Sequence, residues 1–379
     1  MDIGNRHRSK SSRPESPGRR LLLQSALALG AAGLVASPWR RAEAETTVIF
    51  NGWEGYDTHF NYGGFLDERG VVLESSYVSS TEDMITKLKS GGVGSIDFVT
   101  LSFQYTEFAA RADILAPIDP ARIPNIEAMH PRFRSMLDGL TFEGNLYAVP
   151  FTFSSAPLLY APAEVEAAPT SWADLLQPEF KNRIAMWNDV HTNICVWGPV
   201  ATGSTTPSLM THDELVETVD FLIKLKKEHL RTITSGLGEI PDLFARGEII
   251  ASVGWEPMVA WAADKGTEIR IAYPSEGTLA YIDVLNIGKD APNYDLDHEL
   301  IDHMLATDTQ AAFATDNLLG IVNEAAPPLI EGPARDLYPF GDLDGFFDHA
   351  RPYPLFPFES EEHATWNEVL QEYERFNQA

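Results

Sequence analysis

The chain has 379 residues, of which 28 are Lys or Arg and 55 are Asp or Glu, so its net charge at pH 7 is −27. This length is sufficient for two lobes of ordinary size, and an aromatic content of 11% excludes a disordered or low-complexity chain. The acidic balance argues against binding to nucleic acid or to an anionic membrane surface, since both require a basic face. The single cysteine, Cys195, excludes an internal disulfide and a zinc site built from cysteines.

The first 44 residues differ in composition from the rest of the chain. They hold eight basic and three acidic residues, and the pair Arg19-Arg20 precedes an apolar stretch that continues to Trp39. Ala42-Glu43-Ala44 then gives the small-x-small pattern that signal peptidase cleaves. We predict a twin-arginine export signal over residues 1–44, so that the mature protein begins near Glu45 and is periplasmic. The alternative is a basic tail followed by an uncleaved anchor helix.

Removal of this segment increases the charge of the protein. Residues 45–379 hold 20 basic and 52 acidic residues, a net charge of −32. Such an excess favours solubility and attracts cations, which are either small cationic ligands or a basic partner. No other hydrophobic stretch in the sequence is long enough to span a bilayer.

The first part of the mature chain predicts alternating strands and helices. Runs of β-branched and apolar residues predict strands at residues 47–50, 71–73 and 96–99. Ser80-Thr81-Glu82-Asp83 begins a helix that Gly91-Gly92 closes. This order indicates a parallel sheet with helical crossovers, in which ligands bind at the carboxyl ends of the strands. We therefore expect Trp53 and the segment from Ser102 to Tyr105 to lie near a binding site.

A second α/β unit is predicted after Pro150. Its strands are expected at residues 184–187, 249–253, 269–273 and 281–287. The clearest helix pattern runs from Thr211 to Leu230, where Thr211 and Glu214 form a capping box and apolar residues recur at helical spacing. No internal repeat and no Pro-, Gly- or Ser-rich linker separates the two units, which indicates lobes joined by several strands.

Motifs for catalysis and for cofactors are mostly absent from the sequence. There is no Gly-x-Ser-x-Gly elbow, no Walker loop and no Gly-x-Gly-x-x-Gly fingerprint. His298 and His303 resemble a zinc-protease helix, but five residues place them about 140° apart around a helix, so both cannot face one metal ion. We interpret this segment as a solvated helix face. Cys195 lies in an apolar setting and is interpreted as a buried small hydrophobe.

Several motifs in chain order resemble one family. They are the segments Phe50 to Tyr56, Ile96 to Ser102, Tyr147 to Phe151, Thr170 to Lys181, Gly254-Trp255 and Pro274 to Asp283. Over essentially the whole mature chain, the sequence resembles the periplasmic polyamine-binding proteins of ABC importers, the spermidine/putrescine type of extracellular solute-binding protein. Two departures are the insertion of Gly52 between Asn51 and Trp53, and Leu101 where the family has Pro.

The resemblance implies a fold and a mode of action. The expected fold is α/β, two-lobed and of the periplasmic-binding-protein type (type II-like), with a mostly parallel sheet flanked by helices in each lobe. Lobe 1 is expected to comprise residues 45–152 and 283–324, and lobe 2 residues 153–282 and 325–379. A monomer of this kind closes over a small cationic ligand by hinge bending and presents it to an inner-membrane ABC permease. No bond is made or broken, so we expect no enzyme activity, cofactor or metal.

The resemblance also assigns ligand-binding residues. An ammonium group that enters a dry cleft loses its hydration, which carboxylates and aromatic faces must replace. Trp53, Trp255 and Tyr281 match the family's aromatic walls, and Asp283 matches the carboxylate that holds an amine. The full expected set is Trp53, Tyr56, Ser102, Gln104, Asp189, Trp255, Glu256, Tyr281 and Asp283. The alternatives are core packing for Trp53 and Tyr281, a turn or surface carboxylate for Asp283, and a helix cap or loop position for Ser102 and Gln104.

Departures from the family at the site leave the ligand open. Thr192 stands where spermidine binders have a second acid, Met258 where putrescine binders have an Asp, and Leu319 where the family often has a Tyr. A polyamine is the first choice, and a singly cationic or zwitterionic amine is the competitor. Two further alternatives are a secreted hydrolase that uses Asp189 and Glu256 as paired carboxylates, and a binding protein that serves a receptor instead of a permease.

Overall fold

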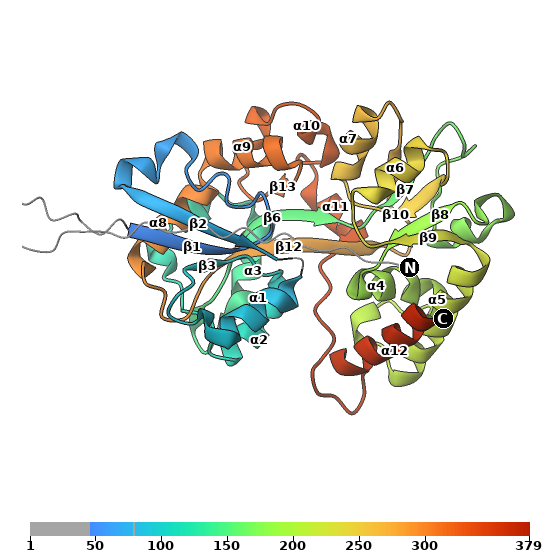
Figure 1. The fold of residues 1–379 in the computed structure, drawn as a ribbon, viewed down its shortest axis with the longest axis horizontal. Coiled ribbons are helices and arrows are strands. Elements are labelled where there is room, and N and C mark those ends of the chain that lie inside the picture. The colour runs from blue at the N-terminus through green and yellow to red at the C-terminus, as the bar shows by residue number, and fades with distance from the viewer. Residues whose placement is uncertain (1–45, 79) are drawn as a thin grey trace, which may run out of the picture. The chain divides into compact units, whose positions relative to one another are not determined.

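Two β-sheets organise residues 46–78 and 80–379, which are the residues that the computed structural model describes. The predicted export signal, residues 1–44, lies outside them. The strands of the first sheet are β1 (Thr46–Gly52), β2 (Val71–Tyr77), β3 (Phe98–Val99), β6 (Val149–Ser155), β12 (Thr278–Ile287), β13 (Gly320–Ile321) and β14 (Ala350–Arg351). Their order is β13-β6-β12-β3-β1-β2, with β14 paired to one end of β12 (Figure 1).

The second sheet has the order β11-β7-β10-β8-β9. Its strands are β7 (Leu158–Tyr160), β8 (Ile184–Trp187), β9 (Leu230–Thr234), β10 (Ala251–Val253) and β11 (Arg270–Ala272), and a separate hairpin pairs β4 (Thr141–Phe142) with β5 (Asn145–Leu146). The parallel pairs are β1 with β2 and β3, as the sequence predicts for the first three strands, and β8 with β9 and β10. Antiparallel pairs of β12 with β3 and β6, and of β7 with β10 and β11, make both sheets mixed.

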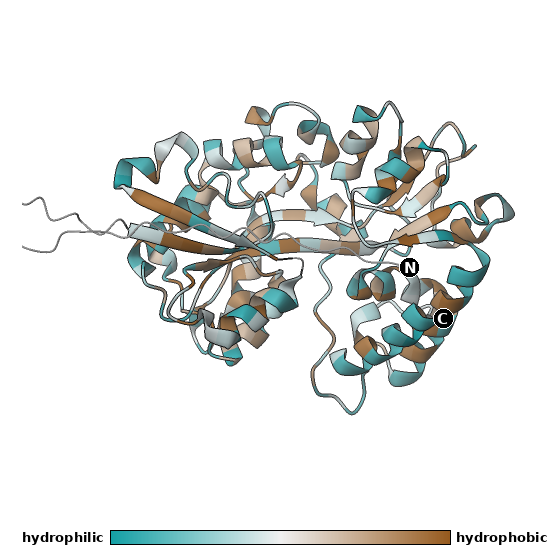
Figure 2. Ribbon diagram, in the orientation of Figure 1, coloured by the Kyte–Doolittle hydropathy of each residue, from teal (hydrophilic) through white to brown (hydrophobic). Residues whose placement is uncertain are grey.

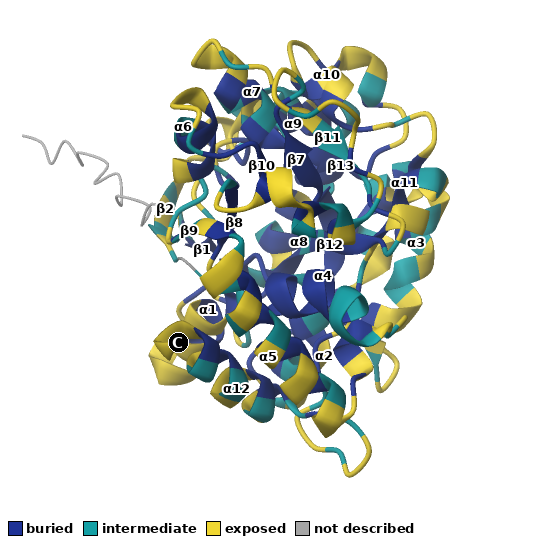
Figure 3. Ribbon diagram, turned by 90° about the vertical axis from the view of Figure 1, so that its right-hand side faces the viewer, coloured by how far each residue is buried: buried dark blue, intermediate teal, exposed yellow. Residues whose placement is uncertain are grey.

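Helices cover both sheets. They are α1 (Thr81–Lys87), α2 (Thr106–Arg111), α3 (Pro131–Met136), α4 (Val190–Thr202), α5 (His212–Glu228), α6 (Glu239–Ala245), α7 (Pro257–Asp264), α8 (Tyr294–Leu305), α9 (Thr307–Asn317), α10 (Ala334–Leu337), α11 (Leu343–His349) and α12 (Trp366–Gln378). The predicted capping box is present, because Thr211 accepts from the Glu214 backbone N–H and the Glu214 carboxylate accepts from the Thr211 N–H. Figure 2 shows hydrophobic residues along the strands, and Figure 3 shows exposed residues on the outer sides of α5 and α12.

The paired strands β6 and β12 link the two halves of the fold. Every residue of β6 is buried, and β12 is buried along most of its ten residues. Their register places Phe153 opposite Ile282 and Thr152 opposite Asp283, so the two predicted lobe boundaries lie opposite each other in this strand pair. These boundaries stay a prediction, since residues 45–379 form one compact unit by their contacts.

The segment around His298 corrects a sequence prediction. His298 is fully buried, its Nε2 accepts from the Asp119 backbone N–H at 2.9 Å, and its Nδ1 pairs with the Tyr294 carbonyl at 2.8 Å. The ring of His303 is partly buried and stacks on Phe65 with ring centroids 4.3 Å apart. The expected solvated face was therefore wrong, because each histidine contacts a different part of the protein that packs against α8. Among the described residues, no cluster of His, Cys, Asp and Glu fits a metal ion, and no helix is long and apolar enough to cross a membrane.

Candidate functional site

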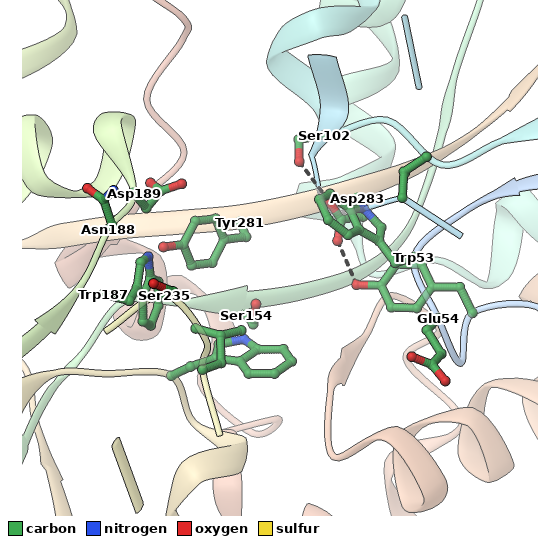
Figure 4. A pocket seen from close by; sticks show the side chains of 14 residues that line it. Trp53, Glu54, Ser102, Ser154, Trp187, Asn188, Asp189, Ser235, Tyr281 and Asp283 are labelled. Atoms are coloured by element: carbon green, nitrogen blue, oxygen red, sulfur yellow. Dashed lines mark hydrogen bonds between the residues drawn. The ribbon is translucent and has the colours of Figure 1, made fainter. Parts of the chain in front are cut away.

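A cavity of about 460 Å³ is lined by residues that follow or belong to strands of both sheets. Its walls are formed by Trp53, Glu54, Tyr56, Val78, Ser102, Ser154, Trp187, Asn188, Asp189, Ser235, Leu237, Trp255, Tyr281 and Asp283. Figure 4 shows Tyr281 between Asp283 on one side and Asp189 on the other. The carboxyl ends of β1 and β8 both meet this cavity, as expected for ligand sites in open α/β sheets.

One end of the cavity is built around Asp283. The Tyr56 hydroxyl donates to Oδ2 of Asp283 at 2.7 Å, and the Ser102 hydroxyl donates to Oδ1 at 2.9 Å (Figure 4). Burial raises the pKa of Asp283 to about 6, although both hydrogen bonds favour the charged form and lower it. Both hydrogen-bond partners are neutral hydroxyl groups, and an ammonium group beside the carboxylate would replace the solvation that burial removes.

The other end of the cavity is formed where β8 leaves the second sheet. Asp189 is the N-cap of α4 and accepts from the Thr192 backbone N–H at 2.7 Å. The hydroxyls of Thr192 and Tyr281 lie 2.6 Å apart, which connects the start of α4 to β12. Tyr281 and Asp283 lie two residues apart on the same strand, so both project toward the same face. The strand β12 therefore carries Asp283 at one end of the cavity and contacts the start of α4 through Tyr281 at the other.

Aromatic rings form the walls between the acidic ends. Trp53, Trp187, Trp255 and Tyr281 line the cavity, and Trp255 packs edge-on against Trp261 with ring centroids 5.5 Å apart. Within the described part of the chain, the Trp53 indole N–H is buried without a hydrogen-bond partner. Aromatic faces attract cations and cover methylene groups, so these walls fit an amine with an aliphatic stem.

The charge of the lining has one sign. Glu54, Asp189 and Asp283 supply three carboxyl groups, and none of the lining residues is a Lys, Arg or His. Cations are therefore favoured and anions are disfavoured in this cavity.

Seven of the nine predicted site residues line the cavity and two do not. Glu256 is fully buried behind the wall, where one carboxylate oxygen accepts from the Ser155 N–H at 2.9 Å and the other from the Ser155 hydroxyl. Burial raises the pKa of Glu256 to about 7. Gln104 lies in the short helical turn after Ser102 and is outside the lining. Glu256 is thus separated from the cavity and cannot act with Asp189 as a catalytic pair there.

Other residues of the lining were not predicted from the sequence. Trp187 and Asn188 flank the exit of a strand that the sequence predicted correctly, so the rule on carboxyl ends would have identified them. Glu54 follows Trp53 and was available by the same rule. Ser154, Ser235 and Leu237 gave no local signal, because tertiary packing alone brings them to the cavity.

Comparison with known proteins defines the class of this chain. Residues 65–336 match the family described as bacterial extracellular solute-binding protein. The chain therefore belongs to this family of extracellular and periplasmic binding proteins. Family membership confirms the predicted class, a solute-binding protein and not an enzyme.

Individual proteins similar to this chain are periplasmic or ABC transporter binding proteins. The chain is 25% identical to the putrescine-binding periplasmic protein PotF of Escherichia coli (strain K12), over 84% of this chain and 90% of that protein. It is 26% identical to the spermidine/putrescine-binding periplasmic protein 1 of Haemophilus influenzae, over 80% of this chain and 83% of that protein. The fold matches the spermidine/putrescine ABC transporter substrate-binding protein PotD of Streptococcus pneumoniae, with a TM-score of 0.72, 22% identity, and coverage of 88% and 99%. This match confirms the predicted two-lobed α/β fold.

Proposed function

We propose that this protein captures a small organic amine with at least two cationic groups, of the putrescine or spermidine type, for an ABC importer. The observation that carries the proposal is the composition of the cavity, which has three carboxyl groups, four aromatic walls and no basic side chain. The names of the relatives, which bind putrescine and spermidine, support the same ligand class.

The acidic groups at the two ends of the cavity can each hold one ammonium group of such a ligand. Asp283 with Tyr56 and Ser102 fits one ammonium group, because its oxygens retain lone pairs beyond the two hydrogen bonds. Asp189 fits the second ammonium group, and the rings of Trp53, Trp255 and Tyr281 cover the methylenes between them. A singly cationic or zwitterionic amine is the competing ligand, since the neighbouring Thr192 is neutral and holds Tyr281.

A thermal-shift screen of residues 45–379 tests the proposal. 1,4-Diaminobutane and spermidine, each at 100 times its dissociation constant, should stabilise the protein by about 2.7 kcal/mol. Butylamine and 4-aminobutyrate, at the same concentrations, distinguish a diamine site from a singly cationic or zwitterionic one. Stabilisation by 4-aminobutyrate alone would reject the polyamine and support the competitor, and no shift with any amine would reject the proposed function.

The mode of action that we propose is closure of two lobes about β6 and β12. The lobes are residues 45–152 with 283–324 and residues 153–282 with 325–379, as the sequence predicts. In the proposed division the chain crosses between the lobes three times, within β6, within β12 and after residue 324. Small rotations at these crossings would open the cavity. The closed monomer would then present one surface to an inner-membrane permease.

We also propose that residues 1–44 direct export and are removed from the periplasmic protein. Support comes from Arg19-Arg20, from the apolar stretch and from the cleavage pattern before Glu45. The double substitution Arg19→Lys, Arg20→Lys should leave precursor in the cytoplasm, as fractionation and N-terminal sequencing would detect. Processing of this variant at the unmodified rate would reject the twin-arginine route.

A further inference from the structure

The C-terminal helix contacts the residues that form one end of the cavity. Tyr373 of α12 is buried, and its hydroxyl oxygen accepts from Nδ2 of Asn193 at 2.7 Å. The same hydroxyl donates to Oδ1 of Asn188 at 3.0 Å. Asn193 also donates through Nδ2 to the backbone carbonyl of Trp187 at 2.9 Å. Asn188 and Trp187 line the cavity, whereas Tyr373 and Asn193 lie behind it.

The hydrogen bonds of this network assign each group a role as donor or acceptor. The Trp187 carbonyl can only accept, so the amide group of Asn193 that faces it must be the nitrogen. That nitrogen also donates to the Tyr373 hydroxyl, which leaves the phenolic proton for Asn188. Asn188 presents its oxygen to Tyr373, so among the described residues its amide nitrogen is the polar group directed away from this network, at the cavity end.

We infer that Tyr373 is a positioning residue that fixes the amide of Asn188 and thereby sets which polar group a ligand meets beside Asp189. With the nitrogen free, this end offers two hydrogen-bond donors next to one carboxylate. A hydroxyl group of a ligand can accept from Asn188 and donate to Asp189 at once. An ammonium group has no acceptor, so it gains only the contact with Asp189. Tyr373 therefore lowers the preference of the site for a second ammonium group, an inference that rests on the proposed function.

The substitution Tyr373→Phe tests this inference because it removes one oxygen and leaves the ring. The freed amide of Asn188 can then turn its oxygen toward an ammonium group. We expect the ratio of the dissociation constant of 4-amino-1-butanol to that of 1,4-diaminobutane to rise roughly fivefold, as titration calorimetry of residues 45–379 would measure. A merely structural role would weaken both ligands equally and leave this ratio unchanged.

Further variants make the test independent of folding defects. Asn188→Asp places only oxygens at this position and should shift the ratio in the same direction even if Tyr373→Phe folds poorly. In an Asn188→Ala background, Tyr373→Phe should no longer change the ratio. Tyr294→Phe, which removes a hydroxyl that donates to the Pro117 carbonyl at 2.6 Å and lies outside the cavity lining, is the matched control.

The outcomes separate this inference from the proposed function. An unchanged ratio in Tyr373→Phe or Asn188→Asp, with both amines still bound, would overturn the role of Tyr373 alone. The same shift in the Asn188→Ala background would also overturn it, because the effect would not pass through Asn188. Wild-type protein that binds neither amine would overturn the proposed function and this inference with it.

Discussion

Asp283 is the residue on which a cationic ligand depends most. Burial raises the pKa of its carboxyl group to about 6, above the value of 3.8 for an unfolded chain. The free folded protein therefore binds this proton more tightly than the unfolded chain does. The stability that the Asp283 carboxyl group contributes to the folded protein is fully present below about pH 4 and is lost as the pH rises toward 6. A bound ammonium group favours the charged carboxylate, so it opposes the binding of a proton to Asp283.

The affinity for 1,4-diaminobutane should consequently fall as the pH is lowered through 6. A proton and an ammonium group compete for the same carboxylate, so the loss should approach tenfold per pH unit below that value. Titration calorimetry between pH 5 and pH 8 measures this dependence, and Asp283→Asn should remove most of it. An affinity that stays constant from pH 7 to pH 5 would contradict the role assigned to Asp283.

His298 gives a prediction about stability. His298→Ala should lower the free energy of unfolding by about 1–3 kcal/mol, because the buried Asp119 N–H would lose its acceptor. Chemical denaturation of residues 45–379 measures this change. His349→Ala, at an exposed position in α11, should change the free energy of unfolding by less than about 0.5 kcal/mol. Equal effects of the two substitutions would show that the buried hydrogen bond contributes nothing.

The sequence predicted cavity residues well at the ends of strands and less well elsewhere. Trp53 and Asp189 follow predicted strands and line the cavity. The carboxyl-end rule indicated Trp53, and the family resemblance indicated Asp189. Glu256 comes directly after Trp255, and the sequence cannot tell which of two adjacent side chains faces the cavity at the start of a helix. Ser155 decides it, since its N–H and hydroxyl draw the Glu256 carboxylate inward. His298 was misjudged because its partner, Asp119, is distant in sequence.

At the scale of elements, the loop between β14 and α12 connects the two halves of the fold. It is anchored on the second-sheet side, where the Ala364 N–H donates to the Met210 carbonyl at 2.8 Å. Its Phe358 reaches α2, which follows β3 of the first sheet, and stacks on Phe108 with ring centroids 4.6 Å apart. Lys89 lies 4.3 Å from the centre of the Phe108 ring. This contact lies outside the cavity lining and joins elements of the two proposed lobes.

Removal of the stack between Phe358 and Phe108 should shorten the time for which the two proposed lobes stay closed over a ligand. Phe358→Ala is expected to increase the dissociation rate of 1,4-diaminobutane roughly two- to tenfold, the effect of one aromatic pair. Stopped-flow fluorescence can follow the reaction, because three Trp residues line the cavity. Leu329→Ala, at another exposed apolar position, is the control. An unchanged dissociation rate in Phe358→Ala would mean that the stack does not resist opening.

Elements with local signals were predicted well, and those defined by distant contacts were not. The strand at 184–187 and the helix capped by Thr211 were found from periodicity and capping chemistry. The strand expected at 96–99 begins only at Phe98. Before it, the Asp97 carboxylate accepts from the Ile49 N–H at 2.8 Å and from the Asn293 N–H at 3.0 Å, contacts that the sequence did not indicate. The extent of β12 beyond the expected 281–287 depends on its pairing with β6 and β14, which no local pattern reveals.

The whole molecule combines a strongly acidic chain with a cavity of the same sign. Residues 45–379 have a net charge of −32, so a cationic ligand meets a favourable field before it reaches the cavity. This long-range attraction is screened by salt, whereas the contact with Asp283 inside the cavity is screened much less. The association rate of 1,4-diaminobutane should therefore fall with added NaCl more than its dissociation rate changes, which stopped-flow measurements can determine. Equal salt effects on both rates would argue against steering by the net charge.

The most direct test of the central claim compares one charge in the cavity with one outside it. Titration calorimetry of residues 45–379 should show that 1,4-diaminobutane binds the wild type, and that Asp283→Asn loses about 2–5 kcal/mol of binding free energy. Asp336→Asn removes an exposed carboxylate outside the cavity lining and should leave the affinity nearly unchanged. Affinity for the diamine that is equal in the wild type and in Asp283→Asn would contradict the proposal that this cavity holds a cationic amine.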